Sequence, residues 1–390
     1  MDYSIAVNRR TKIISALDVA VLTAVSSSES KNTASVAQVD ALKMFNAQMS
    51  LEKFKIGTVS ITVTDDSTGR SAKGSVTGTV ATSFMRVVGM PNIKIDGTAT
   101  ATTAMPPYID FYMLLDNTPS MGVAATPTDV ATMVNNTSDQ CAFACHDLSN
   151  SNDYYKLAKK LGVTMRIDVV RQATQKLTAT ASATEKVTNQ FRMAVYTFGS
   201  SCDGAGLNAV TTLSSSLTSV KSAANNIDLM ATPYHTYNGD QCTDCDGVLK
   251  SMDTQIPTPG PGTSASPQKF LFFVSDGVAD AYYPTTCTQA TAPGGRCMEP
   301  LSVAACTAMK ARGVKIAVLY TTYLDLPTNA WYNSWIAPGP FGPSTNSEIA
   351  KRMKDCASDG FYFEVSPTQG ISDAMTALFQ KAVLQARLTK

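Results

Sequence analysis

The sequence has few histidines, almost no net charge and no long apolar run. Two histidines in 390 residues leave little scope for a metal site or a general base built on imidazole. Thirty-two Lys and Arg against thirty-one Asp and Glu give a net charge of +1, so no general field attracts nucleic acid or an anionic membrane. No apolar stretch reaches the roughly 18 to 20 residues needed to span a bilayer. Specific binding must therefore come from a local site.

The chain does have nine cysteines and an ordinary globular composition. A hydrophobic content of 44% over 390 residues is enough for the cores of two or three domains. Cysteines are this frequent where disulfides form, so we expect an oxidising, extracytoplasmic location. Their odd number leaves at least one thiol unpaired within the chain.

Residues 1–105 predict a small unit in which one long helix packs on an antiparallel sheet. Ile13, Leu17 and Ala24 recur at helical spacing, and we expect this helix to continue to about residue 50. Asp18 interrupts the apolar run that a secretion signal would need unbroken. Alternating β-branched residues follow, with the turn sequence DDSTG between two runs, which is typical of a hairpin.

Residues 106–390 show the pattern of a doubly wound α/β domain. Short, continuously apolar runs alternate with longer amphipathic ones, as in a mostly parallel sheet that helices cover on both faces. The expected strands are IDFYMLL, FRMAVYTF, KFLFFVS, VKIAVLYTT and GFYFEV. The expected helices cover residues 154–184, 214–229, 245–255, 299–312, 345–357 and 370–388.

Oxygen-bearing side chains gather where two of these strands end. Asp116, Thr118 and Ser120 follow the first strand at every second position, so in an extended segment they point to one side. Asp276 follows the strand KFLFFVS. Ligands of open α/β sheets bind at the carboxyl ends of strands, and Mg²⁺ prefers hard oxygen ligands, so these residues predict half of a metal site. The alternative is that they only cap helices and shape turns.

The same residues resemble a known motif. D-x-T-x-S after the first strand, Thr-Asp in CTDCDGVLK and S-D-G after a later strand are similar to the metal-ion-dependent adhesion site of von Willebrand factor A domains. The matching positions are Asp116, Thr118, Ser120, Thr243 and Asp276. The resemblance implies that the hydroxyls bind Mg²⁺, or Mn²⁺ or Ca²⁺, that the carboxylates act largely through water, and that one coordination position stays open for a partner's acidic group. Thr118 replaces the usual serine, and Thr236 competes with Thr243 for the third motif.

A second resemblance covers nearly the whole chain. The stretches DYSIAVNRRTKIISALDVAVLTAV, GTVATSFMRVVGMPNIKIDGTATA and NDYYKLAKKLGVTMRIDVVRQATQKL resemble the TadG-type proteins of the Flp, or tight-adherence, pilus assembly system. In that family a pilin-like membrane helix precedes the DYS-type stretch, so the resemblance implies an exported chain without its anchor. It implies a periplasmic, inner-membrane-anchored or pilus-tip location. The implied partners are minor pilins, TadE- or TadF-like components, or a surface ligand that offers a carboxylate.

The cysteines allow three cofactor hypotheses. CAFACH is similar to a covalent haem motif but has three residues between its cysteines instead of two, so no haem is expected. A zinc site from His235, Cys242 and Cys245 lacks an evident fourth ligand. A redox pair of Cys242 and Cys245 lacks a thioredoxin-like context.

We instead expect structural disulfides that close surface loops. Cys287 would bond to Cys297 across an insertion, and Cys306 to Cys356 between two helices. The sequence leaves open the connectivity of the remaining five, which are Cys141, Cys145, Cys202, Cys242 and Cys245.

No catalytic constellation is evident in the sequence. It contains no nucleophile elbow and no phosphate loop, and Asp110, Asp168 and Glu364 lack a spacing that pairs them as acid and base. We therefore expect no enzyme and no nucleic-acid partner. The leading hypothesis is a pilus-associated assembly or adhesion protein that binds a partner or surface through Mg²⁺. The alternative is a minor-pilin or assembly scaffold whose metal site is vestigial or only stabilising, and a redox or haem-linked activity comes third.

Overall fold

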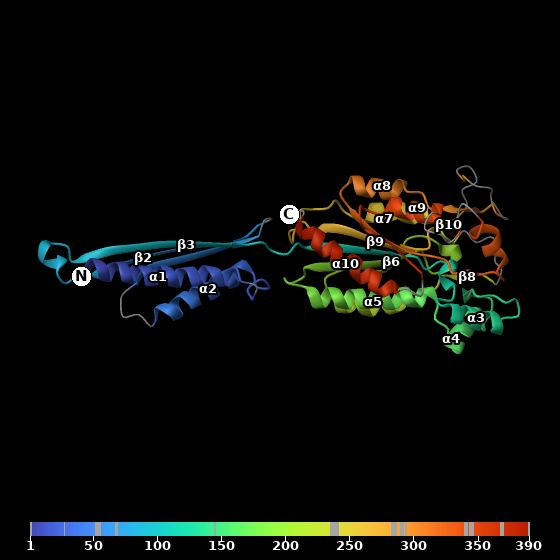
Figure 1. Ribbon diagram of the computed structural model, residues 1–390, viewed down its shortest axis with the longest axis horizontal. Coiled ribbons are helices and arrows are strands. Elements are labelled where there is room, and N and C mark those ends of the chain that lie inside the picture. The colour runs from blue at the N-terminus through green and yellow to red at the C-terminus, as the bar shows by residue number, and fades with distance from the viewer. Residues whose placement is uncertain are drawn as a thin grey trace. The chain divides into compact units, whose positions relative to one another are not determined.

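The chain divides into two compact units, which we call the stem unit and the α/β unit (Figure 1). The stem unit is Met1–Pro107 with Glu185–Gln190, and the α/β unit is Tyr108–Thr184 with Phe191–Thr389. The computed structural model describes residues 2–26, 28–50, 56–66, 69–143, 146–234, 242–281, 287–288, 292, 295–338, 342, 347–366 and 370–388. Within these ranges, no helix has both the length and the apolar character that crossing a membrane requires.

The stem unit packs two helices on one face of a three-stranded antiparallel sheet. Its elements are α1 (Asp2–Ala24), α2 (Ala34–Met49), β1 (Ile56–Asp65), β2 (Arg70–Ala81), the 3₁₀ helix η1 (Met85–Val88) and β3 (Asn92–Thr103). β2 is the central strand, and buried residues alternate with exposed ones along most of it. That alternation is typical of an antiparallel sheet with one face on a core and the other in water.

The helical region of the stem is interrupted, so the expectation of one helix to about residue 50 is wrong. α1 ends at Ala24, within a serine-rich stretch, and Thr33 starts α2 as an N-cap whose hydroxyl accepts the N–H of Val36. Serine and threonine side chains compete for backbone groups and favour such ends. The break allows α2 to pack on both α1 and β1.

Two glycines allow α1 to lie directly on the sheet. A Cβ at Gly74 would come within 2.7 Å of Leu17 Cδ1, and a Cβ at Gly97 within 2.6 Å of Ile14 Cγ1. Any larger residue would push the helix away, so these glycines set the distance between helix and sheet.

The α/β unit is built on a six-stranded sheet in the order β13-β12-β9-β4-β6-β7. Five strands are parallel, and β7 runs antiparallel to β6 at the edge. The strands are β4 (Ile109–Leu115), β6 (Phe191–Thr197), β7 (Asn208–Ser214), β9 (Gln268–Ser275), β12 (Lys315–Thr321) and β13 (Tyr362–Val365). The sequence did not predict β7, because this partly exposed edge strand has no continuous apolar run.

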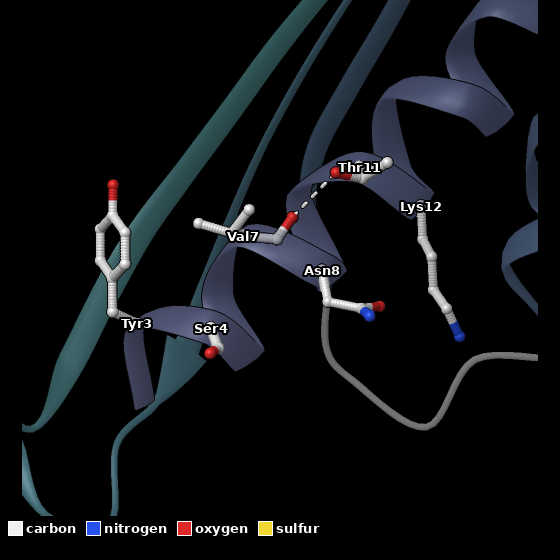
Figure 2. A pocket seen from close by; sticks show the side chains of 6 residues that line it. All are labelled: Tyr3, Ser4, Val7, Asn8, Thr11 and Lys12. Carbon is white, nitrogen blue, oxygen red and sulfur yellow. Dashed lines mark hydrogen bonds between the residues drawn. The ribbon is translucent and has the colours of Figure 1, made fainter. Parts of the chain in front are cut away.

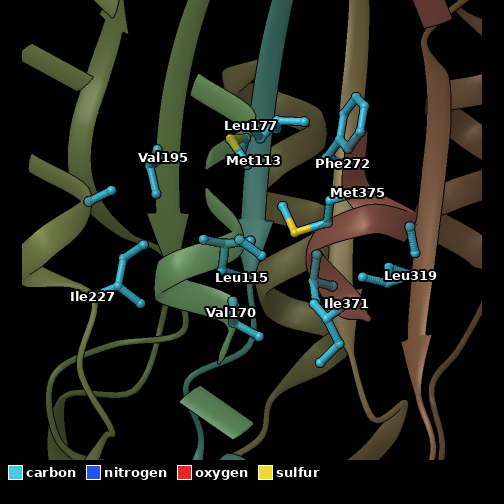
Figure 3. Close-up of a cluster of buried hydrophobic side chains, with 14 of the residues drawn as sticks. Met113, Leu115, Val170, Leu177, Val195, Ile227, Phe272, Leu319, Ile371 and Met375 are labelled. Atoms are coloured by element: carbon cyan, nitrogen blue, oxygen red, sulfur yellow. The ribbon is translucent and has the colours of Figure 1, made fainter. Parts of the chain in front are cut away.

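Helices cover both faces of this sheet. One core lies under α5 (Arg166–Thr184), α6 (Leu217–Ala223) and α10 (Ile371–Leu388), and the other under α7 (Cys245–Gln255), α8 (Ala304–Ala311) and α9 (Glu348–Cys356). Along β4, Met113 and Leu115 enter the first core, shown in Figure 3, while Tyr112 and Leu114 enter the second. Burial on both faces explains why β4 is apolar at almost every position.

Three predicted helices are shorter than expected. Gly162, with φ of 70°, ends α4 (Tyr154–Leu161), so the stretch predicted as one helix from residue 154 becomes α4 and α5. The helix predicted from residue 299 starts only at Ala304, because the preceding residues form a strand that pairs with β10. The helix predicted over 214–229 is reduced to α6 and a 3₁₀ turn.

The remaining elements are η2 (Pro119–Gly122), α3 (Pro127–Asn136), β5 (His146–Asp147), η3 (Cys202–Gly204), η4 (Ala224–Asn226), β8 (Ala231–Thr232), β10 (Val278–Ala281), β11 (Cys297–Pro300) and the π-helical η5 (Tyr332–Ile336).

The winding of the chain reverses between β4 and β9. β6 and β7 follow on one side of β4, whereas β9, β12 and β13 lie on its other side. In open α/β sheets, ligands bind at such a reversal, outside the carboxyl ends of the strands. The residues directly after β4 and β9 are Asp116 and Asp276.

Candidate metal centre

The segment after β4 brings Asp116, Thr118 and Ser120 together. The N–H of Asp116 still donates to the Val274 carbonyl of β9, at 2.9 Å, and the chain then leaves the sheet. Oδ1 of Asp116 accepts the backbone N–H of Thr118 at 2.9 Å and its hydroxyl at 2.7 Å. The Thr118 and Ser120 hydroxyls lie 3.3 Å apart. Hydrogen bonds within the motif thus hold its oxygens on one side.

The segment after β9 adds a second carboxylate to the same network. The Ser275 hydroxyl donates to Oδ2 of Asp116 at 2.6 Å, and the N–H of Gly277 donates to that hydroxyl at 2.9 Å. Asp276 accepts, through Oδ2, the hydroxyl of Tyr323, which follows β12, at 2.7 Å. Three neighbouring strands therefore contribute polar side chains to one buried network.

The two carboxylates are buried so deeply that their charges are unfavourable without compensation. Asp116 and Asp276 are both fully shielded from solvent. Burial and, secondarily, the nearby negative charge of Asp276 raise the pKa of Asp116 to about 6. The hydrogen bonds from Ser275 and Thr118 lower it only in part. A cation in this network would stabilise both ionised carboxylates.

One cationic side chain already lies beside Asp276. Arg166, the first residue of α5, is fully buried, with Nη1 3.5 Å from Oδ2 of Asp276. Its Nη2 donates to the Thr322 carbonyl at 2.8 Å, and its guanidinium lies 4.6 Å from the Tyr323 ring centroid. Within the described part of the chain, Nε and Nη1 have no hydrogen-bond partner. Arg166 therefore offsets one of the two negative charges, while two of its nitrogens make no hydrogen bond.

The third predicted motif is less closely joined to the others. Thr243 is buried just before α7, and its backbone exchanges hydrogen bonds of 3.1 and 3.0 Å with Asp280 of β10. Burial and the charges of Asp116 and Asp276 raise the pKa of Cys245, two residues later, well above its ordinary value. This segment is thus within electrostatic reach of the carboxylates, but among the described residues no hydrogen bond links the Thr243 side chain to them. The competing Thr236 lies outside the described residues.

Sequence reasoning missed three members of the network, which are Ser275, Tyr323 and Arg166. Ser275 was inside the quoted S-D-G motif, and Tyr323 directly follows a predicted strand, so the strand-end rule could have found both. Arg166 had no comparable signal, because it lies at a helix start 50 residues after Asp116 and reaches the site only through the tertiary fold.

The donor set suits a small divalent cation. Hydroxyl oxygens of Thr118 and Ser120 and carboxylate oxygens of Asp116 and Asp276 are hard ligands of the kind that Mg²⁺ prefers. The side chains are already oriented by one another, which lowers the cost of ordering them around an ion. With Arg166 included, the net charge of the network is −1, which still favours a cation.

The cysteines in the described residues form three disulfides, and two of them are the pairs proposed from the sequence. The bonds are Cys287–Cys297, Cys306–Cys356 and Cys202–Cys242. Because Cys242 is bonded to Cys202, both the zinc site and the redox pair with Cys245 are wrong. His235 and Cys145 lie outside the described residues. Among the described cysteines, Cys141 and Cys245 form no disulfide, and burial raises the pKa of Cys141 to about 11.

A separate cluster of potential metal ligands in the described residues is explained by a disulfide. Cys287, Cys297 and Glu299 lie close together, but the two sulfurs are joined in a disulfide and cannot act as thiolates. His146, the histidine of CAFACH, has its Nδ1 2.8 Å from Oδ2 of Asp153, the N-cap of α4.

No protein-family model matches this chain, and no curated protein sequence matches it. Among solved structures, it is similar to the pilus adhesin SpaC of Lactobacillus rhamnosus GG, with 10% identity and a TM-score of 0.38 over 84% of this chain and 34% of that one. The chain thus spans about a third of that adhesin's length. The vWF domain of the type V pili tip protein Mfa5 of Porphyromonas gingivalis is similar with 13% identity and a TM-score of 0.38, over 73% of this chain and 97% of that one. The PilB minor pilin of Streptococcus sanguinis is similar with 12% identity and a TM-score of 0.38, over 86% of this chain and 78% of that one.

Proposed function

We propose that this chain is a pilus-associated adhesion or assembly protein of the tight-adherence type, with a von Willebrand factor A domain that binds a partner through Mg²⁺. The observation that supports this most is the buried network of Asp116, Thr118, Ser120 and Asp276 at the point where the sheet reverses its winding. The TadG-type resemblance of the sequence supplies the pilus context, and three disulfides fit an extracytoplasmic location.

In this proposal, Thr118, Ser120 and Thr243 would hold the ion through hydroxyl oxygens, and Asp116 and Asp276 would orient them and balance its charge. When bound, the ion supplies a Lewis-acidic position for a carboxylate of the partner. The chain's own part is to fix the hydroxyls before the ion arrives. Arg166 adds positive charge behind the site, which favours an anionic partner once the ion has neutralised the two carboxylates.

Calorimetric titration of the whole chain with MgCl₂ tests the metal site. We expect saturable binding that is lost in Asp116→Asn, which removes one buried charge without changing the side chain's shape. Asp253→Asn makes the same charge change in α7, at an aspartate paired with Arg312 on the surface, and should bind as the parent does. Absence of binding to the parent chain, or equal binding to Asp116→Asn, would contradict the metal site.

The scaffold alternative has one observation in its favour. Arg166 neutralises part of the carboxylate charge, so the network can persist without an ion. A strain that carries Asp116→Asn in the full-length protein separates the two functions. If pili assemble but adherence is lost, the site serves adhesion, and if both remain normal, the site is only structural.

A further inference from the structure

The turn between β2 and β3 is unusual because its large apolar side chains point into solvent. Among the described residues, its members are the most exposed group of large apolar side chains on the chain. Their exposed fractions are 67% for Phe84, 88% for Val87, 75% for Val88 and 50% for Met90, and Tyr3 at the start of α1 adds 72%. We call this set the apolar tip.

The backbone of the apolar tip is held by hydrogen bonds within the stem unit. Oδ2 of Asp2 accepts the N–H groups of Ser83, Phe84 and Met85, at 3.1, 2.7 and 2.8 Å. The N–H of Val87 donates to the Phe84 carbonyl, that of Gly89 to Arg86, and that of Met90 to Met85. Six backbone N–H groups of the turn, those of residues 83, 84, 85, 87, 89 and 90, thus have acceptors within the stem unit.

The tip also projects away from the rest of its unit. Gly89 has a φ of 86°, and a Cβ built on it would meet no atom within 4 Å. Tyr3 belongs to the apolar tip because the neighbouring Asp2 caps η1. Figure 2 shows Tyr3 at one end of a shallow pocket on α1 whose other end is Lys12.

Basic side chains outnumber acidic ones in the two segments that lead to the apolar tip. Residues 2–12 and 82–96 contain five basic side chains and two acidic ones, and the carboxylate of Asp2 is buried in its capping role. The basic residues are Arg9, Arg10, Lys12, Arg86 and Lys94. The whole chain has a net charge of only +1, so this is a local concentration of positive charge.

We propose that the apolar tip is a membrane-docking surface that inserts its side chains into the interface of an anionic lipid bilayer. Three features together support a bilayer as the occupant. Backbone groups that enter a bilayer must be hydrogen-bonded internally, exposed apolar side chains gain from leaving water, and Arg86 in the turn and basic residues in the neighbouring parts of α1 and β3 are attracted to anionic lipid headgroups. The proposal is independent of the metal site, because all of its residues belong to the stem unit.

Sedimentation of the whole chain with lipid vesicles tests the docking surface. We expect the chain to pellet with vesicles of equal parts phosphatidylcholine and phosphatidylglycerol, and much less with phosphatidylcholine alone. The double variant Val87→Asp, Val88→Asp should reduce the bound fraction by about tenfold or more, because it places charge where the apolar contact forms. Leu148→Asp changes another exposed apolar residue, in the α/β unit, and should leave binding unchanged.

A second variant separates charge from apolar contact. Arg86→Glu, Lys94→Glu should lose the preference for anionic vesicles while its melting temperature stays that of the parent, because both side chains are exposed. Failure of the parent to pellet with either vesicle, or equal pelleting of the Val87→Asp, Val88→Asp variant, would overturn the proposal. Sedimentation velocity that shows a parent dimer, dissociated by the tip variant in the absence of lipid, would assign the surface to a second copy instead.

Discussion

The two units bury charged side chains in different ways. In the stem unit, Arg70 is buried with its guanidinium fully used: it pairs with Asp65 and donates to the carbonyls of Glu29 at 2.8 Å and Asn32 at 2.7 Å. In the α/β unit, Arg166 is just as buried, but its Nε and Nη1 make no hydrogen bond in the described part of the chain, and Nη1 has only the ion pair with Asp276.

The acidic side chains show the same contrast. Asp2 caps a 3₁₀ helix in the stem, and three backbone N–H groups satisfy its carboxylate. Asp116 and Asp276 instead lie close enough for one charge to disfavour the other. A buried charge whose hydrogen bonds are complete can be purely structural, whereas buried groups that are crowded or unsatisfied are candidates for a binding site. The predictions below test whether this distinction holds.

The largest expected effect is on the stability of the stem unit, when the buried and fully hydrogen-bonded Arg70 is replaced. Arg70→Met should lower the free energy of unfolding by about 3 to 5 kcal/mol, because it leaves the carbonyls of Glu29 and Asn32 without donors. Denaturant unfolding measures the change. Arg10→Met, which removes an exposed arginine from α1, should change stability by less than about 1 kcal/mol. Equal effects of the two variants would mean that the hydrogen bonds of the buried Arg70 do not stabilise the stem unit.

The next effect is a pH dependence to which Asp116 contributes. The pKa of Asp116 rises from 3.8 to about 6 on folding, so the folded chain binds more protons than the unfolded chain between these values. The contribution of Asp116 to stability without metal should therefore fall as the pH rises from about 4 to 6, by about 3 kcal/mol at most. Melting curves in chelator measure the fall, and Asp116→Asn should reduce it and leave the part that comes from the raised pKa values of Asp246 and Asp280. A fall of the same size in that variant would assign the effect to another group.

A smaller effect comes from the partial compensation by Arg166. Arg166→Met removes the positive charge beside Asp276 while filling most of the same volume, so the affinity for Mg²⁺ should rise by roughly tenfold. The metal-free variant should also be less stable than the parent, and Mg²⁺ should restore part of the loss. Titration and melting of the same sample measure both changes. Unchanged affinity would mean that Arg166 does not compete with the ion.

The smallest effect concerns the break between α1 and α2. Thr33→Ala removes the hydroxyl that accepts the N–H of Val36 and should cost about 1 kcal/mol. Thr23→Ala removes a hydroxyl that bonds only to the Val19 carbonyl inside α1, so it should cost less than about 0.5 kcal/mol. Thermal unfolding of the pair shows whether the N-cap helps to define where α2 begins.

The sequence predicted the parts of the fold that depend on local patterns. β4, β9 and β12 are apolar at nearly every position, so their runs identified a sheet covered on both faces. The break after Ala24 was missed because helical spacing of apolar residues resumes beyond it, and only the N-cap at Thr33 marks the boundary.

The candidate site could be predicted only where its residues are adjacent in sequence. Asp116, Thr118 and Ser120 form one short motif, and their alternate spacing is visible without a structure. Arg166 and Tyr323 come from other elements and reach Asp276 through the packing of α5 and the end of β12. No local pattern records such contacts, so the charge balance of the site required the structure.

The Cys202–Cys242 bond links the candidate site to the oxidation state of the chain. Cys242 directly precedes Thr243, so this disulfide ties the third candidate hydroxyl to the loop after β6. If the proposed metal site includes Thr243, its third hydroxyl is therefore held by a bond that only oxidising conditions form.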